Sequence, residues 1–287
     1  MCGIVGYIGH EEALPLLLSS LQRVTYRGYD SFGVAVANGQ GIQLHRAIGT
    51  VEEHIRSIPS LKGTIGIGHT RWATVGKVCQ ANAHPHTDCS SDIVVVHNGD
   101  IENYRELKAE LQARGHQFRS ETDSEVIAHL VEANLNGSLV QATLDTIEKL
   151  DGSYAIVLAH KDFRELVVAR RSSPLVVGLG DGCYYAASDI PAILSYTNKF
   201  LFLEDGDVAR LSDEGVQVWH DGKKAYRQPH LVHWGVEELG KNGHKHFMLK
   251  EILEQPRGVR DTLAPYLKAS GANIKRCGNW WRKVKGW

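Results

Sequence analysis

The sequence predicts an α+β fold in which many short strands pack in layers against a few helices. Short runs of β-type residues, many of them valine and isoleucine, recur along the chain, and such runs are typical of strands. Two amphipathic helices follow one another in the middle of the chain instead of alternating with single strands. Helices and strands that are segregated in this way favour a layered α+β domain over a regular βαβ repeat.

The N-terminal third of the chain is expected to contribute mainly strands. Residues 4–8 form one such run, and leucines at positions 14, 17, 18 and 21 then follow the spacing of a helix that ends near Val24. Further strands are expected at residues 34–37, 42–46, 65–69 and 93–97. The dipeptide Asn98-Gly99 after the last of these strands is also a strong hairpin signal.

Two helices are expected in the middle of the chain, with strands after them. Asn103 is placed to cap a helix that runs to residue 114 and ends at Gly115. Residues 122–125, Thr-Asp-Ser-Glu, have the pattern of a capping box in front of an apolar helical stripe. From residue 154 to residue 219, short β-type runs alternate with turns rich in glycine and aspartate, so this stretch is expected to be nearly all strand.

The composition is that of an ordinary globular protein and excludes several functional classes. The chain has 287 residues and a formal net charge of −1, so neither nucleic acid nor an anionic membrane is expected as its main partner. No apolar run approaches the ~20 residues that span a bilayer, and the N-terminus lacks the pattern of a secretory signal. Five cysteines without a C-x-x-C pair indicate reduced thiols and a cytoplasmic location.

The cysteine at position two is the most informative single residue. Removal of Met1 would leave Cys2 with a free α-amino group beside its thiol. These two groups titrate with pKa values near ~8 and ~8.5, so both are partly in their reactive forms around neutral pH. An N-terminal amine can act as the general base for a nucleophile on the same residue. The alternative is an inert buried cysteine, because free cysteine is among the most buried residue types.

Polar residues at the ends of the predicted strands and helices are candidates for binding a substrate. Arg71 follows a strand and can grip a carboxylate through two hydrogen bonds, while Asp123 can pair with an ammonium group. Together they would hold the two charged ends of an amino acid. The alternatives are a structural ion pair for Arg71 and a helix cap for Asp123. The side-chain amide of Asn98 and the backbone N–H of Gly99 are candidate donors to a developing oxyanion.

Six motifs occur in order along the chain. They are Cys2-Gly-Ile-Val-Gly-Tyr7, Tyr26-Arg-Gly-Tyr-Asp-Ser31, Thr70-Arg-Trp-Ala-Thr74, Asn82-Ala-His-Pro-His86, His97-Asn-Gly99 and Glu121-Thr-Asp-Ser-Glu125. Together they resemble the class II glutamine amidotransferases, which are N-terminal-nucleophile hydrolases. The segment His246-Phe-Met-Leu-Lys-Glu-Ile252 is similar to the connector of the glutamine–fructose-6-phosphate aminotransferases (isomerizing), also called glucosamine-6-phosphate synthases. Roughly residues 2–265 are therefore similar to the glutaminase half of that group.

The resemblance implies a fold, a substrate and a set of residue roles. The fold is a four-layer αββα arrangement, and the reaction is hydrolysis of L-glutamine to L-glutamate and ammonia through a γ-glutamyl thioester on Cys2. No cofactor and no metal are implied. The implied oxyanion hole is formed by Asn98 and Gly99. The resemblance implies that Arg71 binds the α-carboxylate of glutamine and Asp123 its α-ammonium group, while Thr74, His84 and Trp72 also line the glutamine site. Trp72 would in addition gate the ammonia path, and Arg27 would support Cys2.

The chain departs from the family pattern in three places. Val75 stands where histidine is frequent, and Asp100 stands where an apolar residue is usual. The sugar-isomerase half that accepts the ammonia is absent, so we expect a glutaminase domain at residues 2–240 and a connector at residues 241–265 toward that half. Residues 266–287 form an atypical basic and aromatic tail. Such a tail suggests contact with nucleic acid or a membrane, but we prefer a disordered, out-of-frame or truncated end.

Two other functions remain open at this point. One is a stand-alone glutaminase subunit that supplies ammonia to a different synthase. The other is a zinc-binding module, because two thiols and two imidazoles lie within eleven residues, at Cys79, His84, His86 and Cys89. Their spacing matches no common zinc finger.

Overall fold

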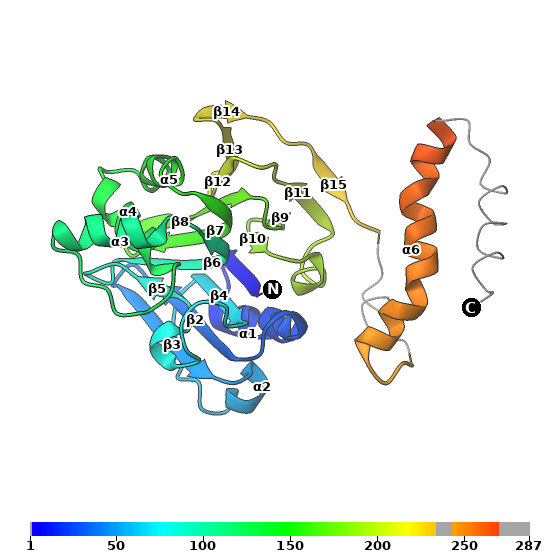
Figure 1. The fold of residues 1–287 in the computed structure, drawn as a ribbon, viewed down its shortest axis with the longest axis horizontal. Coiled ribbons are helices and arrows are strands. Elements are labelled where there is room, and N and C mark those ends of the chain that lie inside the picture. Colours follow the sequence, from blue (N-terminus) through cyan, green and yellow to red (C-terminus); the bar gives the residue numbers. More distant parts are fainter. Residues whose placement is uncertain (1, 234–242, 270–287) are drawn as a thin grey trace. The chain divides into compact units, whose positions relative to one another are not determined.

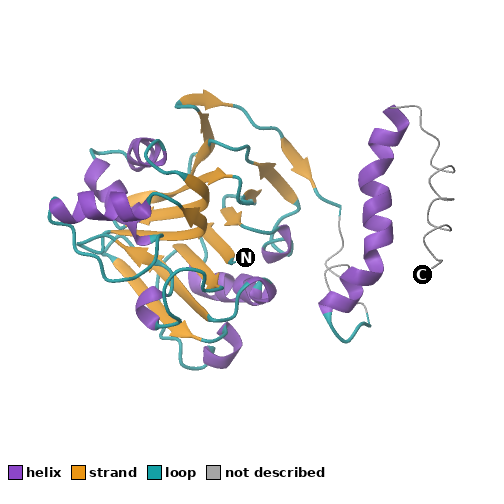
Figure 2. Cartoon of the chain, in the orientation of Figure 1, coloured by secondary structure: helices purple, strands orange, loops and turns teal. Residues whose placement is uncertain are grey.

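The computed structural model describes residues 2–233 and 243–269 (Figure 1). The chain divides into two compact units, residues 1–233 and residues 234–287. The first unit is built from two antiparallel sheets, and Figure 2 shows its strands in the middle and its helices at the margins. It therefore has four layers, in the order helix, sheet, sheet and helix.

The first sheet holds the N-terminal strand in its interior. Its eight strands follow the order β15-β11-β9-β10-β1-β4-β2-β3. Their bounds are β1 Gly3–Ile8, β2 Ser31–Ala37, β3 Ile42–Ile48, β4 Ile65–Arg71, β9 Val176–Leu179, β10 Tyr184–Ala187, β11 Lys199–Phe202 and β15 Pro229–Leu231. Because Gly3 pairs with Thr70 of β4, the backbone beside Cys2 is fixed by the sheet.

The second sheet carries the long strand β6 next to its edge. Its seven strands follow the order β14-β13-β12-β8-β7-β6-β5. Their bounds are β5 His86–Thr87, β6 Ile93–Ile101, β7 Gly152–His160, β8 Phe163–Arg171, β12 Asp207–Ser212, β13 Gly215–His220 and β14 Lys223–Ala225. As predicted, the stretch after residue 154 is almost entirely strand and turn.

Helices cover the outer face of each sheet. Helix α1 (Ala13–Arg23) packs on β1, β4 and β2, with the short α2 (Val51–His54) beside it. Helices α4 (Glu125–Asn134) and α5 (Leu139–Ile147) pack on the second sheet, and α3 (Tyr104–Ala113) packs on α4. Single 3₁₀ turns lie in connecting segments, at η1 Thr25–Arg27, η2 Gln80–Asn82 and η3 Ile190–Ala192.

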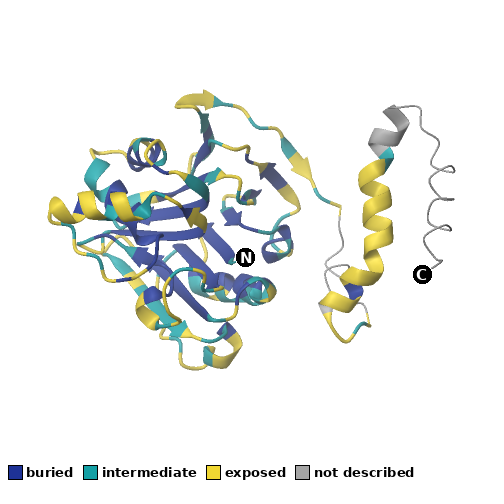
Figure 3. Cartoon of the chain, in the orientation of Figure 1, coloured by how far each residue is buried: buried dark blue, intermediate teal, exposed yellow. Residues whose placement is uncertain are grey.

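One apolar core lies between the two sheets and a second lies between the second sheet and its helices, and the strands between these cores are buried along most of their length (Figure 3). On β6, Val94 and Val96 belong to the core between the sheets. Ile93 and Val95 belong to the core between the second sheet and its helices. This alternation is the period of two that a strand imposes, so an almost continuous apolar run is buried on both faces.

Every strand predicted in the N-terminal third is present, and each extends beyond its predicted range. The longest extension is in β6, which continues through Asn98 and Gly99 and ends with Ile101 opposite Gly152. The hairpin interpretation of Asn98-Gly99 is therefore wrong. Gly99 has the positive φ of 129° that its dipeptide suggests, but it lies inside a paired strand.

The predicted helices are present, but two of them differ in detail from the sequence pattern. The buried face of α1 is formed by Ala13, Leu16, Leu17, Ser20 and Leu21, so the leucines at positions 14 and 18 lie at its margin. Helix α3 follows Asn103 and ends before Gly115, whose φ is 97°, as predicted. The Asn103 side chain makes no capping hydrogen bond to α3. Its amide instead donates to Lys149 O and accepts from the Asp151 N–H.

The capping box predicted at residues 122–125 does not form. Helix α4 follows Ser124, whose hydroxyl lies 2.8 Å from His97 Nδ1 and makes no capping hydrogen bond. The Glu125 carboxylate accepts instead from the backbone N–H groups of Arg119 and Ser120, each at 2.7 Å. Glu125 therefore holds the preceding loop against the helix, because its carboxylate reaches further back along the chain than a capping box requires.

The second unit contains one helix within the part of it that is described, α6 (Phe247–Ala269). This helix covers residues 247–265 of the expected connector and continues to Ala269. Its exposed large apolar side chains are Met248, Leu249, Ile252, Leu253, Val259 and Leu263. No helix in the described ranges is long and apolar enough to cross a membrane. The disorder predicted for the tail falls largely on residues 270–287, which lie outside the described residues.

Candidate functional site

A pocket opens beside Cys2, where elements of both sheets meet. Cys2 precedes β1, Arg71 ends β4, and Asn98 lies near the end of β6. The residues that line the pocket are Cys2, His69, Arg71, Trp72, Thr74, Val75, His84, His97, Asn98, Gly99, Thr122, Asp123 and Ser124. The pocket thus brings together every predicted site residue except Arg27, which contacts Cys2 from outside the pocket.

Hydrogen bonds hold both the thiol and the carbonyl of Cys2. The Trp72 N–H donates to Cys2 Sγ at 3.2 Å, while Cys2 O accepts from Asn98 Nδ2 at 2.9 Å and from Arg27 Nε at 3.2 Å. Burial raises the pKa of the Cys2 thiol, against the smaller lowering effects of the Trp72 N–H and the charges of Arg71 and Arg27. The thiol is therefore mostly protonated near neutral pH and needs a base before it can attack.

The orientation of the Asn98 amide is fixed by a histidine that the sequence analysis missed. His69 Nε2 lies 3.1 Å from His97 O and 3.0 Å from Asn98 Oδ1. Because a carbonyl only accepts, His69 Nε2 must carry the proton and donate. Asn98 Oδ1 therefore faces His69, and Asn98 Nδ2 is left to face Cys2. His69 stands just before the Thr-Arg-Trp-Ala-Thr motif, but no pattern in the sequence assigns it to Asn98.

Gly99 is the residue whose place most strictly requires glycine. Its φ of 129° lies in a region that side chains disfavour, and a Cβ atom there would stand 2.0 Å from Ser153 O. Gly99 itself is exposed on the pocket side, in contrast to the buried strand before it. The chain therefore presents bare backbone to the pocket at this point. Asp100, where the family pattern has an apolar residue, is exposed.

Arg71 brings a buried positive charge to the pocket. The residue is only 3% exposed, and its guanidinium donates to Lys77 O at 3.3 Å and to Val75 O. Both partners are neutral carbonyls, and Arg71 takes part in no ion pair within the described residues. Burial lowers the pKa of Arg71, yet a guanidinium stays charged in proteins. The structural ion pair considered for Arg71 is thus not found.

Asp123 brings a buried carboxylate to the same pocket. It is 6% exposed, and its Oδ2 accepts from the Ile101 N–H at 2.9 Å. Its Oδ1 accepts from the Ser124 hydroxyl at 3.3 Å. The helix-cap interpretation of Asp123 is wrong, because Ser124 occupies the N-cap position of α4. Asp123 is instead bound to Ile101 at the end of β6, and Ile101 lies two residues after Gly99.

A second missed residue pair joins the Arg71 side of the pocket to the Asp123 side. Asn82 Oδ1 accepts from the Glu121 N–H at 2.9 Å, and Asn82 Nδ2 donates to Glu121 Oε2 at 3.1 Å. Asn82 Nδ2 also donates at 3.0 Å to Lys77 O, one of the carbonyls that bind Arg71. Each residue opens one of the motifs quoted above, but nothing in the sequence indicates that they pair.

Three buried histidines, called the histidine floor below, carry no charge. His69 and His84 line the pocket, and His86 packs edge-on against His84. The ring of His84 lies 4.1 Å from that of His69, nearly parallel, and 4.5 Å from that of His86. Burial lowers the pKa of His69 and of His86 to about 3, and it lowers that of His84 well below its usual range. The floor is therefore neutral near pH 7, and His84 contributes shape and hydrogen bonding to the pocket, not charge.

The remaining predicted residues are placed at the rim or behind the nucleophile. Trp72 is 44% exposed, and its ring meets the Tyr29 ring edge-on at 5.2 Å. Thr74 is exposed where it lines the pocket. Arg27 forms an ion pair of 2.7 Å with Asp189, which anchors it against η3. Arg27 thus supports the Cys2 carbonyl from a fixed position.

The four residues of the zinc alternative do not form one site. His84 and His86 belong to the histidine floor. Cys89 contacts two different histidines, His116 and His129. Among the described residues, the only metal-ligand group that is found contains Cys89 but none of the other three. The zinc-binding module predicted from spacing is therefore wrong in its ligands.

Comparison with known proteins decides the family. A family model described as a glutamine amidotransferase domain matches residues 69–195. The glutamine–fructose-6-phosphate aminotransferase (isomerizing) of Thermus thermophilus is 48% identical over 279 residues, which are 96% of this chain and 46% of that protein. The chain carries a class II glutamine amidotransferase domain. The protein of the same name from Gloeobacter violaceus is 50% identical over 270 residues, 92% of this chain and 44% of that one.

A solved amidotransferase structure shares the fold of this amidotransferase domain. Glutamine phosphoribosylpyrophosphate amidotransferase from B. subtilis superposes with a TM-score of 0.68 at 27% identity, over 77% of this chain and 49% of that one. The predicted four-layer αββα N-terminal-nucleophile hydrolase fold is confirmed. The chain spans about half the length of the curated relatives it matches.

The neutral histidine floor predicts a pH dependence of stability. His69 and His86 have pKa values of about 3 when folded, but they bind protons near their ordinary value of ~6.5 when unfolded. Between these values the unfolded state binds more protons, so the free energy of unfolding falls as the pH falls. Each histidine contributes about 1.4 kcal/mol per pH unit.

Urea unfolding between about pH 6.5 and about pH 4.5, above most carboxylate titration, measures this slope. His86→Asn should reduce the slope, and the exposed His230→Asn should leave it unchanged. A free energy of unfolding that stays constant over this range would contradict a buried, neutral histidine floor.

Proposed function

We propose that the amidotransferase domain hydrolyses L-glutamine to L-glutamate and ammonia, with Cys2 as the nucleophile. The observation that carries this proposal is the convergence of the Cys2 thiol, the buried Arg71 guanidinium and the buried Asp123 carboxylate on one pocket. An α-amino acid has one carboxylate and one ammonium group, which these two opposite charges match. The side-chain amide of glutamine is then left to meet the thiol.

The proposed nucleophile is activated by its own α-amino group. Once Met1 is removed, the free amine of Cys2 takes the thiol proton, and the thiolate attacks the amide carbon of glutamine. This base is needed because burial raises the pKa of the thiol. The proton then passes to the leaving nitrogen, which departs as ammonia and leaves a γ-glutamyl thioester. Water cleaves the thioester to glutamate and restores the thiol.

We assign the oxyanion of the tetrahedral intermediate to Asn98 and Gly99. A side-chain amide has two N–H bonds. One N–H of Asn98 donates to Cys2 O, which leaves the second for an oxygen bound next to the thiol. The backbone at Gly99 is exposed on the same side. Donors fixed in advance by His69 and the β6 ladder stabilise a developing charge without having to reorient.

We further assign the two ends of glutamine to the two charged residues. Arg71 would bind the α-carboxylate and Asp123 the α-ammonium group, while Thr74 and His84 line the space between. Trp72, exposed at the rim, is proposed as the gate on the ammonia path. Arg27 is given a supporting role, because it holds the Cys2 carbonyl and is not itself part of the pocket lining.

We also propose that the ammonia serves synthesis of glucosamine 6-phosphate from fructose 6-phosphate and glutamine. The names of the Thermus and Gloeobacter relatives support this acceptor. In this proposal residues 2–240 form the glutaminase domain, residues 241–265 form a connector to a sugar-isomerase half outside this chain, and residues 266–287 have no assigned role. The exposed apolar side chains of α6 are suited to contact with such a half.

The setting proposed for this reaction is the cytoplasm. Cys2, Cys79, Cys89 and Cys183 are all free thiols, which suits a reducing compartment. A stand-alone glutaminase that feeds a different synthase would use the same pocket, so the identity of the ammonia acceptor has to be tested separately.

The first prediction concerns the nucleophile. Intact-mass analysis should show a mature chain that begins at Cys2, and Cys2→Ala should abolish glutamate release from glutamine, because no other group in the proposal can form the thioester. Cys183→Ala, in the turn between β9 and β10, is the matched control and should retain activity. Full activity in a chain that keeps Met1 would contradict the role of the α-amine.

The second prediction separates substrate binding from transition-state stabilisation. Arg71→Ala should cost about 2–5 kcal/mol of binding and raise KM roughly thirtyfold to a few thousandfold, because it strands a buried substrate charge. Asn98→Ala should instead lower kcat by roughly a hundredfold or more, because the oxyanion exists only in the transition state.

Arg164→Ala, which removes a half-exposed ion pair with Asp213, serves as the control for loss of an arginine. Steady-state kinetics on folded variants measures both parameters. A near-normal KM for Arg71→Ala would refute its assignment to the α-carboxylate.

The third prediction concerns the acceptor. Glutamate release by this chain should be indifferent to added fructose 6-phosphate, and no amino sugar should form, because the described pocket contains only the glutamine-side residues. The assay compares glutamate release with and without the sugar and then measures glucosamine 6-phosphate. Stimulation by the sugar, or any amino sugar from the pure chain, would show that the acceptor site lies within these residues.

A further inference from the structure

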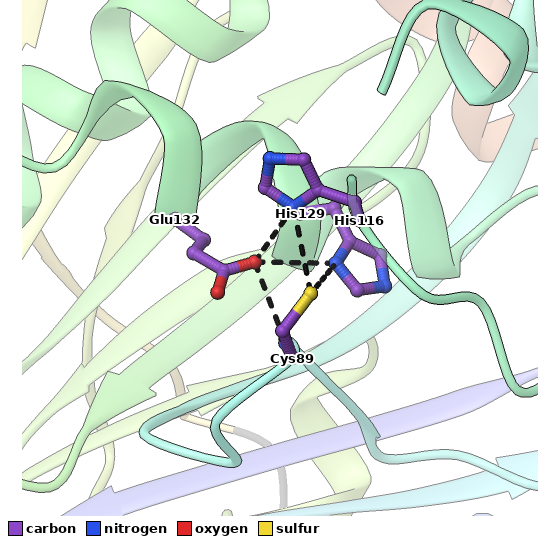
Figure 4. A group of neighbouring side chains, drawn as sticks. All are labelled: Cys89, His116, His129 and Glu132. Atoms are coloured by element: carbon purple, nitrogen blue, oxygen red, sulfur yellow. Dashed lines mark hydrogen bonds and ion pairs between the residues drawn. The ribbon is translucent and has the colours of Figure 1, made fainter. Parts of the chain in front are cut away.

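Four side chains of metal-ligand type converge outside the glutamine pocket (Figure 4). Cys89 lies between β5 and β6, His116 follows the end of α3, and His129 and Glu132 lie on α4. One ligand atom from each, the Sγ, two imidazole nitrogens and a carboxylate oxygen, lies within 4.8 Å of all the others. These four residues are called the Cys89 cluster below. None of them lines the glutamine pocket.

The spacing of the ligand atoms fits a tetrahedral zinc ion. With Zn–S near ~2.3 Å and Zn–N or Zn–O near ~2.0–2.1 Å, tetrahedral angles place sulfur about 3.5 Å from nitrogen, and nitrogen about 3.3 Å from oxygen. Cys89 Sγ lies 3.6 Å from His116 Nδ1 and 3.5 Å from His129 Nδ1. Glu132 Oε2 lies 3.3 Å from His129 Nδ1 and 2.8 Å from His116 Nδ1. Of these four distances only the one between Glu132 Oε2 and His116 Nδ1 is too short, and a small rotation of the Glu132 side chain would lengthen it.

We propose that the Cys89 cluster binds one Zn²⁺ ion as a structural site. A thiolate, two imidazoles and a carboxylate are all ligands that zinc accepts, and their mixture of soft and borderline donors disfavours magnesium and calcium. Four protein ligands complete a tetrahedron and leave no open position for a reacting water, which is typical of structural and not catalytic zinc. The site is distinct from the proposed glutaminase function and does not rest on it.

The surroundings of the cluster orient its ligands as zinc sites require. On the far side of the ring, the Glu125 carboxylate faces His129 Nε2 at 3.6 Å, slightly longer than the hydrogen bond that such a carboxylate accepts from a metal-bound histidine. The Gln117 N–H donates to Cys89 Sγ at 3.5 Å, and Arg119 Nη2 donates to Cys89 O at 3.0 Å. The first contact holds the sulfur in place, and the second holds the backbone of Cys89.

The burial of the cluster suits a tightly bound ion that can still enter. His129 is fully buried, and the Phe118 ring packs on it at 4.3 Å, so one side of the site is dry. The side chains of His116 and Glu132 are 13% and 25% exposed, which leaves an approach from solvent. The bound ion would join three separate chain segments, the loop before β6, the end of α3 and the middle of α4.

Metal analysis of the whole chain tests the proposal. The Cys2→Ala variant is the form to use, because the amine and thiol of a mature N-terminal cysteine can themselves chelate divalent ions. Its lack of glutaminase activity does not matter, so failure of this test is distinguishable from failure of the proposed function. After exposure to Zn²⁺ and dialysis, the chain should retain about one zinc per molecule.

Substitution of the ligands identifies the site. Replacing zinc by Co²⁺ should give the charge-transfer absorption of a cobalt–thiolate bond and the intense visible bands of a tetrahedral ion. Cys89→Ser should remove the charge-transfer band, whereas Cys183→Ser should keep it. His116→Gln, at the more exposed ligand, should also lose the retained zinc, and its circular dichroism shows whether the variant is folded.

Thermal unfolding gives a second readout. Removal of zinc with a chelator should lower the Tm of the Cys2→Ala chain by at least several degrees, because an ion that binds the folded state stabilises it by mass action. The chelator should leave the Tm of folded His116→Gln unchanged. The proposal is overturned if about a tenth of an equivalent of zinc or less is retained, if iron or copper is retained in place of zinc, or if the cobalt spectrum survives Cys89→Ser.

Discussion

The hydrogen bond from Asn98 Nδ2 to Cys2 O is the interaction on which the site depends, because it joins the two sheets at the proposed nucleophile. Cys2 stands at the start of β1 in the interior of the first sheet, and Asn98 lies on β6 in the second. The apolar core between the sheets sets their separation, and His69 sets which end of the Asn98 amide faces Cys2. The layers of the fold thus act as the frame that brings a nucleophile and a donor to hydrogen-bond distance.

The pocket holds two buried charged side chains, Arg71 and Asp123, and neither charge is neutralised by its surroundings. The histidine floor is neutral because burial lowers the pKa of each ring, so it neither repels a cation nor neutralises an anion. Arg71 is satisfied by carbonyl oxygens, and Asp123 by N–H and O–H donors. Each charge is therefore solvated by dipoles that hold it in place without cancelling it. Such a pocket is complementary to a zwitterion, and it would be a costly place for two unpaired charges without one.

Most of the fold was predictable from the sequence because hydrophobic periodicity is a local property. The apolar run Ile-Val-Val-Val at residues 93–96 is enough to predict β6, and the Gly115 stop is enough to end α3. The wrong predictions also rest on local sequence signals, and in each case contacts with residues elsewhere in the fold override the signal. Asn98-Gly99 has the composition of a turn, but β7 pairs with it along its whole length and keeps it extended. The capping box failed because the Thr122 hydroxyl bonds Ser120 and His86, while the Glu125 carboxylate binds the loop before it.

The candidate site was predictable in its parts and not in its connections. The motifs named the residues that line the pocket, since each motif has a distinctive local composition. The bond between Asn82 and Glu121 and that between His69 and Asn98 join residues about thirty to forty positions apart, and only the fold determines them. The same holds for the Cys89 cluster. Spacing alone had grouped Cys89 with its sequence neighbours, whereas the fold pairs it with side chains from α4 and the end of α3.

Helix α4 connects the glutamine pocket to the Cys89 cluster through Glu125. Burial alone would raise the pKa of Glu125, but hydrogen bonds from His129, Ser120 and Arg119 lower it to about 2, so the carboxylate is ionised. One charge therefore holds the loop before α4 through two backbone N–H groups and faces a ring of the cluster on its other side. Asp123 lies between that loop and that helix. The loop before Asp123 is consequently held by a carboxylate that also faces a ligand of the proposed zinc ion, while Asp123 itself is held by the Ile101 N–H at the end of β6.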